Sequence, residues 1–113
     1  MASYRRLAEI ARSGGPGPFL VVIKDCGAEG SGMLSFPMPG VSFALDFPNR
    51  GAATLELLER LDDIVAAAGG AVYPAKDARL SGERFRRYFP QWEALQAHVD
   101  PRFSSGFWRR VTG

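Results

Sequence analysis

Two segments of the chain have the hydrophobic pattern of β-strands. The run at 19–23 is continuously apolar and rich in β-branched and aromatic residues, which predicts a strand buried on both faces that ends at Lys24 and Asp25. The run at 41–47 alternates strictly, so it predicts a strand with two different faces. Its apolar face carries Val41, Phe43, Leu45 and Phe47, and its other face carries Ser42, Ala44 and Asp46.

Helical patterns surround these strands. A short apolar stripe after Ser3 predicts a helix that ends before Gly14. Leucine, isoleucine and valine recur every three or four residues at 50–68 and predict an amphipathic helix, with Asn49 as its N-cap and Gly69–Gly70 at its end. A short strand at 71–74 follows, then a helix from Ser81 to Tyr88 and another from Pro90 to about His98. The tail at 102–113 has weak periodicity, and we expect it to be poorly ordered without a partner.

This order of elements predicts an α+β fold. We expect a small antiparallel sheet covered by two helices, half of a ferredoxin-like unit, with a short-helical C-terminal extension. Two or three strands are marginally stable alone, so the sheet should continue in other polypeptide or in a homodimer formed through its open edge. Basic side chains outnumber acidic ones only from Lys76 onward, which places a domain boundary between 1–72 and 73–113.

Composition limits the classes of function. The chain has 113 residues, 46% of them hydrophobic, and a net charge of +2, which is too small to indicate nucleic acid or a membrane as partner. The single cysteine, Cys26, excludes an internal disulfide. One cysteine and one histidine cannot form a zinc cage unless carboxylates join them, and we predict no metal site. The sequence has no signal peptide and no membrane span, so we expect a cytoplasmic protein. A complete dinucleotide-binding enzyme does not usually fit in this length.

The segment at 84–89 mixes arginines with aromatic residues, and three interpretations of this cluster are open. The cluster could bind nucleic acid through phosphate contacts and base stacking. It could be a small amphipathic helix that packs Phe85, Tyr88 and Phe89 while its arginines stay in solvent. The arginines could instead contact an acidic surface or cofactor phosphates. The low net charge favours the packed helix.

Short motifs along most of the chain resemble a known family. In order they are LSFP at 34–37, PG at 39–40, LDFP at 45–48, GGAVYPAKDAR at 69–79, Phe85, YFP at 88–90, VDP at 99–101, Phe103, Ser105 and RR at 109–110. In this order and spacing they resemble the C-terminal part of bacterial FAD-dependent oxidoreductases of the vanillyl-alcohol oxidase superfamily, especially members that oxidise sugars and aldonolactones. In that family residues 1–72 would belong to the substrate-binding (cap) domain, and 73–113 would return to the FAD-binding domain.

The resemblance also implies roles for individual residues. Tyr73 matches a tyrosine that contacts the flavin, and Lys76 matches a catalytic lysine beside the isoalloxazine ring and the substrate. Lys24 matches another lysine that faces the substrate pocket. Ser42 and Ala44 stand where one sugar-oxidising member has an asparagine and a cysteine lining that pocket, so these substrate-binding positions differ from the family pattern. An ammonium group near the flavin would offset the negative charge left by hydride transfer.

The resemblance therefore implies a C-terminal fragment or subunit of an FAD-linked oxidoreductase that oxidises a CH–OH group of a sugar or alcohol by hydride transfer. The family binds FAD mainly through an N-terminal domain with a Gly-rich phosphate loop, and this chain has no match to it. We expect the isolated chain to be inactive and to bind no FAD tightly. The alternative is a stand-alone α+β dimerising module that binds protein or nucleic acid through its basic tail.

Overall fold

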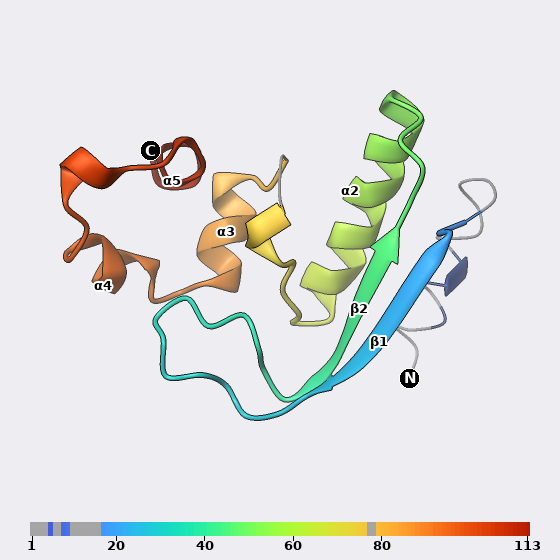
Figure 1. Ribbon diagram of the computed structural model, residues 1–113, viewed down its shortest axis with the longest axis horizontal. Coiled ribbons are helices and arrows are strands. Elements are labelled where there is room, and N and C mark those ends of the chain that lie inside the picture. The colour runs from blue at the N-terminus through green and yellow to red at the C-terminus, as the bar shows by residue number, and fades with distance from the viewer. Residues whose placement is uncertain (1–4, 6–7, 10–16, 77–78) are drawn as a thin grey trace. The chain divides into compact units, whose positions relative to one another are not determined.

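The computed structural model describes residues 5, 8–9, 17–76 and 79–113. Contacts divide the chain into two compact units. The strand unit comprises Met1–Gly27 and Pro39–Gly70, and the helical unit comprises Ala28–Met38 and Ala71–Gly113. Figure 1 shows the elements of both units. Most of the helix predicted near the N-terminus lies outside the described residues.

The described part of the strand unit contains one antiparallel pair of strands. β1 spans Leu20–Cys26 and β2 spans Gly40–Asp46, in a register that runs from Leu20 opposite Asp46 to Cys26 opposite Gly40. The Phe19 N–H extends the ladder by donating to the Asp46 carbonyl at 2.9 Å. Both predicted strands are confirmed, and β2 ends two residues before Pro48, which has no N–H for the ladder.

The predicted burial of the first strand on both faces is wrong for this structure. Ile23 is 63% exposed and Val21 47% exposed, and Phe19 just before the strand is 74% exposed. The sheet in the described part of the chain has two strands, so β1 is hydrogen-bonded along one edge only. A continuous apolar run is typical of a strand covered on both faces, and the described residues do not supply that cover.

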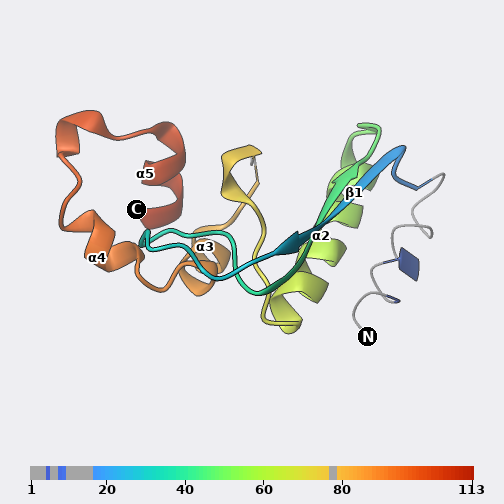
Figure 2. The same cartoon turned by 60° about the horizontal axis from the view of Figure 1, so that its bottom comes forward.

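The long helix of the strand unit is α2, Ala52–Ala67, which runs alongside the two strands in both views (Figures 1 and 2). Its predicted apolar stripe is buried at Leu57, Leu61 and Ile64. The N-cap is Gly51 rather than the predicted Asn49. Asn49 instead forms a turn before the helix, in which its Oδ1 accepts a hydrogen bond from the Gly51 N–H at 3.0 Å.

The C-terminus of α2 confirms the predicted glycine stop. Gly69 has φ 74°, a left-handed conformation that glycine adopts without steric cost. The Gly70 N–H donates to the Val65 carbonyl at 2.9 Å, and the Gly69 N–H donates to the Ala66 carbonyl at 3.2 Å. This pair of bonds is the Schellman motif, and it satisfies carbonyls that the helix leaves free.

The helical unit consists of short elements. They are η1 (Pro74–Lys76), α3 (Gly82–Tyr88), α4 (Trp92–Gln96), η2 (Pro101–Phe103) and α5 (Gly106–Thr112). The strand predicted at 71–74 is absent, since residues 71–73 have no regular structure and Pro74 begins a 3₁₀ turn. The tail at 102–113, for which we expected poor order, is largely helical. Two strands plus helices confirm the α+β class.

Serine caps explain two of these short helices. The Ser81 hydroxyl accepts a hydrogen bond from the Arg84 N–H at 3.2 Å and caps α3, as predicted. The Ser105 hydroxyl accepts one from the Trp108 N–H at 3.0 Å and caps α5. A lone serine is a weak signal for the start of a helix. The helix that begins after Ser81 was predicted, and the one that begins after Ser105 was not.

Aromatic packing holds the helical unit together. Phe85 is 1% exposed, and its ring centroid lies 5.2 Å from that of Phe89 on the same helix and 5.7 Å from that of Phe107 on α5. Val111 of α5 is fully buried, and its carbonyl accepts a hydrogen bond from Arg86 Nη1 at 3.2 Å. The predicted packing of Phe85, Tyr88 and Phe89 is therefore confirmed, whereas Arg86 bonds to α5 in addition to facing solvent.

Candidate functional site

The three residues predicted to bind substrate lie together on one face of the sheet. Lys24 pairs directly with Ser42 across the antiparallel ladder, and Ala44 lies two residues further along β2, opposite Val22. Residues directly opposite each other in such a ladder project from the same face, and residues two apart in a strand do so too. Lys24 and Ala44 are exposed, and Ser42 is half-buried.

This face combines hydrogen-bonding groups with small neighbours. The Lys24 ammonium offers three donors, and the Ser42 hydroxyl both donates and accepts. Gly40 and Ala44 flank Ser42 on the same face and add little or no side-chain bulk. Such a surface can hydrogen-bond the hydroxyl groups of a polar molecule.

Cys26 also belongs to this face, and the sequence analysis did not place it there. It pairs with Gly40 at the end of β1, two residues beyond Lys24, and it is half-buried. The period of two in a strand was the signal that could have found it, but the predicted strand ended at Lys24 and Asp25.

The helical unit carries the other two predicted residues. Tyr73 is 51% exposed, and its ring packs against Phe36, with 5.1 Å between centroids and 57° between planes. Lys76 ends η1, the turn that starts directly after Tyr73. The side chain of Lys76 lies outside the described part of the structure. Phe36 was part of a matching motif, but nothing in the sequence connected it with Tyr73.

These residues fit one kind of contact with a flavin. A half-exposed tyrosine can place its ring against the planar isoalloxazine system. The phosphates of FAD would need backbone N–H groups at a glycine-rich turn that opens a helix. The glycine-rich segment after β1 instead runs through an irregular loop into β2. The described residues therefore fit contact with the ring and supply no phosphate cradle there.

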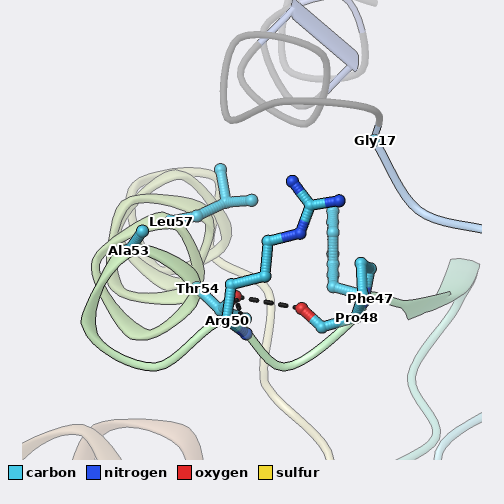
Figure 3. Close-up of a pocket in the computed structure, with 7 residues that line it drawn as sticks. All are labelled: Gly17, Phe47, Pro48, Arg50, Ala53, Thr54 and Leu57. Carbon is cyan, nitrogen blue, oxygen red and sulfur yellow. Dashed lines mark hydrogen bonds between the residues drawn. The ribbon is translucent and has the colours of Figure 1, made fainter.

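A hollow at the start of α2 is separate from the predicted residues. Gly17, Phe47, Pro48, Arg50, Ala53, Thr54 and Leu57 line it (Figure 3). The Thr54 hydroxyl closes its base by donating to the Pro48 carbonyl at 3.0 Å and accepting from the Arg50 N–H at 2.9 Å. Its volume of about 30 Å³ leaves room for about two water molecules.

The described part of the chain shows neither a metal-ligand cluster nor a membrane-spanning helix. In the described ranges, no three His, Cys, Asp or Glu side chains are grouped as metal ligands. Among the helices that the structure describes, none is long and apolar enough to cross a membrane.

An exposed ion pair stands out in the electrostatics of the helical unit. The Asp100 carboxylate caps η2 and lies 2.7 Å from the Arg102 guanidinium. The side-chain hydrogen bond from Arg102, followed by the bond from its backbone N–H, lowers the pKa of Asp100 from its ordinary value. This pair stabilises the turn and has no predicted part in the candidate site.

Sequence comparison adds the decisive observation. The chain is 37% identical over 110 residues to decaprenylphosphoryl-β-D-ribose oxidase of Mycolicibacterium smegmatis, and the alignment covers 93% of this chain. The chain is homologous to part of an FAD-linked oxidase. It is also 37% identical over 112 residues to an uncharacterized protein in the mprA 5′ region of Streptomyces coelicolor. No family model matches the chain.

The comparison also shows how much of these relatives the chain represents. It spans 24% of the length of the Mycolicibacterium oxidase and 29% of the length of the Streptomyces protein. The resemblance to FAD-linked oxidases is confirmed, and both relatives are bacterial proteins. The roles of Tyr73, Lys76, Lys24, Ser42 and Ala44 stay predictions.

Proposed function

We propose that this chain is the C-terminal part of an FAD-linked oxidoreductase that oxidises a secondary alcohol group of a sugar or related alcohol. The observation that carries the proposal is the 37% identity to an FAD-linked ribose oxidase across nearly the whole chain. The chain spans about a quarter of that oxidase, so the FAD-binding domain would come from other polypeptide. FAD, when bound, would accept the hydride from the substrate carbon.

In this proposal the sheet face holds the substrate. Lys24 and Ser42 lie opposite each other on adjacent strands, so their polar groups can bind neighbouring hydroxyls of one sugar. Ala44 takes up little space on the same face, where a larger side chain would narrow the room for substrate. Lys24 is exposed, so its ammonium group can reach oxygen atoms of the substrate.

The segment at 73–76 would serve the flavin side of the reaction. Tyr73 would place its half-exposed ring against the isoalloxazine system, and Lys76 would hold positive charge near the substrate oxygen and the ring. A fixed cation near developing negative charge stabilises a transition state more than the ground state. Lys76 is thus the proposed catalytic residue.

The first test asks what the chain does alone. We expect the purified chain to elute without a visible flavin absorption band and to oxidise no sugar, because the glycine-rich segment after β1 opens no helix that could bind the FAD phosphates. Size-exclusion chromatography with absorption detection reports flavin and oligomer together. A stoichiometric flavin band would contradict the need for a separate FAD-binding domain.

The second test supplies that domain in a chimera. In the chimera, this chain replaces the aligned segment of the Mycolicibacterium oxidase. Reduction of the flavin is followed as the loss of its absorption band, with decaprenylphosphoryl-β-D-ribose, other sugars and simple alcohols as test substrates. We expect FAD binding and reduction by at least one sugar. The parent oxidase is the positive control, and a folded, FAD-bound chimera that no sugar or alcohol reduces would overturn the proposal.

Single substitutions in the chimera then test the residues. Lys76→Ala should slow flavin reduction by about 100-fold or more, the usual loss when one charge-stabilising group is removed from a reaction centre. Arg60→Ala, which removes an exposed cation from α2, is the matched control and should react at the normal rate. Equal rates for the two variants would remove Lys76 from the catalytic role.

A further inference from the structure

The loop between the two strands belongs to the helical unit through its contacts. The chain leaves the strand unit after Gly27 and returns to it at Pro39, and the segment Ala28–Met38 makes its contacts with the helical unit. Within this loop, Phe36 is half-buried, and its ring centroid lies 5.1 Å from that of Tyr73. This distance is within the range of a favourable aromatic pair.

Local hydrogen bonds hold the loop in shape around Phe36. The hydroxyl of Ser35 accepts from the Gly30 N–H at 2.9 Å and donates to the Pro37 carbonyl at 3.4 Å. The Ser35 N–H donates to the Gly32 carbonyl at 3.1 Å. A Cβ at Gly30 would meet the Ser35 hydroxyl at 2.9 Å, so a larger residue there would force the Ser35 side chain to move. These hydrogen bonds restrict the backbone next to Phe36, and they thereby restrict where its ring can lie.

Tyr73 itself has no such support from secondary structure. Residues 71–73 belong to no helix or strand, and the Tyr73 side chain is in contact with the ring of Phe36. About half of Tyr73 stays exposed, which leaves ring surface available for a second contact. η1 begins directly after Tyr73 and ends at Lys76.

We propose that Phe36 is a positioning residue for Tyr73, which it holds in the orientation needed to contact the flavin. This inference rests on the proposed function. Phe36 contacts the Tyr73 ring, and the half of Tyr73 that stays exposed could contact the isoalloxazine system. Preorganisation of this kind matters because a small misplacement of a contacting group costs a large factor in rate.

The first measurement needs only this chain. Tyrosine ring signals are recorded by NMR in the wild type and in Phe36→Ala, with Tyr73→Phe to assign the Tyr73 resonances. Loss of the Phe36 ring current should shift the Tyr73 ring signals, while Phe103→Ala, which removes a phenylalanine that is 81% exposed, should leave them in place. Unchanged Tyr73 signals in Phe36→Ala would overturn the proposal, whatever the chain does with FAD.

The second measurement uses the chimera with the FAD-binding domain. Phe36→Ala should lower the rate of flavin reduction at saturating sugar about 10-fold and change the KM for sugar less than about twofold, because Phe36 acts on the flavin contact and not on the substrate. Phe36→Tyr keeps the ring and should restore most of the rate. Phe103→Ala should match the wild type.

The outcomes separate the two proposals. If the unsubstituted chimera reduces no flavin, the proposed function fails, and the role of Phe36 fails with it. If that chimera is active and Phe36→Ala matches it, only the role of Phe36 fails. A fall in rate that Phe36→Tyr does not restore would also count against positioning, since both variants would then act through general damage to the loop.

Discussion

The strand unit and the helical unit differ in where their apolar side chains lie. In the helical unit, Phe85, Phe89 and Leu80 are at most 2% exposed, although the helices that surround them have five to seven residues. In the strand unit, β1 has the strongest apolar pattern of the chain, and Ile23 is 63% exposed. A hydrophobic pattern therefore predicts that a segment belongs in a core, and it does not say which polypeptide supplies the rest of that core.

Geometry explains the difference. Two short helices can close a small core by themselves, as α3 and α5 do around Phe85 and Val111. A pair of strands has two free edges and needs cover on its faces, so it is marginally stable alone. The FAD-linked oxidase to which the chain is similar is about four times as long as the aligned segment, and we propose that the missing cover belongs to that additional polypeptide.

The largest expected effect tests this contrast directly. Phe85→Ala should lower the free energy of unfolding of the helical unit by about 3–5 kcal/mol, because it empties a space that the described side chains fill completely. Ile23→Ala on β1 is the matched truncation and should change stability by less than about 0.5 kcal/mol, as an exposed residue does.

Urea unfolding measures these two variants. Trp92 and Trp108 both lie in the helical unit, so tryptophan fluorescence reports that unit, and far-UV circular dichroism adds α2. If Ile23→Ala proved as destabilising as Phe85→Ala, the sheet would be covered in solution, and the contrast between the units would be lost.

The next effect concerns the Schellman motif at the end of α2 in the strand unit. Gly69→Ala should lower the free energy of unfolding by about 1–2 kcal/mol, because alanine pays a steric cost at φ 74°. Circular dichroism during thermal unfolding is the measurement. Gly27→Ala is the control, since a Cβ there meets no atom within 4 Å. Equal losses in both variants would mean that the Schellman motif contributes nothing particular to the helix.

The same contrast shows what could be predicted from sequence. Features that depend on neighbouring residues were predicted correctly. The alternation at 41–47 predicted β2, Ser81 predicted the start of α3, and Gly69 predicted the end of α2. Predictions were wrong where the structure of a segment depends on contacts with residues distant in the sequence. The exposure of β1 and the order of the tail around Val111 depend on residues far away in the sequence.

The candidate site follows the same rule. The shared face of Lys24, Ser42 and Ala44 follows from the period of two once the register is known. The contact between Phe36 and Tyr73 joins residues that are distant in the sequence, and no periodicity could reveal it. The resemblance to a family supplied roles for Tyr73 and Lys76, but it supplied no geometry.

A smaller effect is expected when a positive charge is introduced on the exposed strand β1. Ile23→Lys should leave the free energy of unfolding within about 0.5 kcal/mol of wild type, because the side chain is largely exposed. If the chain self-associates through its sheet edge, as we predict, this variant should shift the equilibrium toward monomer in analytical ultracentrifugation. Leu55→Lys, which adds the same charge at an exposed position of α2, should associate like the wild type. Association that both variants weaken equally would point to a general charge effect.

The smallest expected effect lies at the surface of the helical unit, at the pair formed by Asp100 and Arg102. Hydrogen bonds from Arg102 lower the pKa of Asp100 in the folded protein below the value of about 3.9 in an unfolded chain. The pair therefore stabilises the fold fully above that unfolded value, and the stabilisation is lost as the pH falls through the lower folded pKa.

Asp100→Asn keeps an oxygen that can cap η2 but removes the charge, so it isolates the contribution of the ion pair. We expect wild type to be slightly more stable than the variant near neutral pH, and the two to converge as the pH falls toward about 2. Because both side chains are exposed, added salt should reduce the difference at neutral pH. Urea unfolding by tryptophan fluorescence at several pH values measures it. A difference that persisted in acid would show that the substitution acts on the cap geometry of η2, and the surface of the helical unit would then depend on local hydrogen bonding rather than on charge.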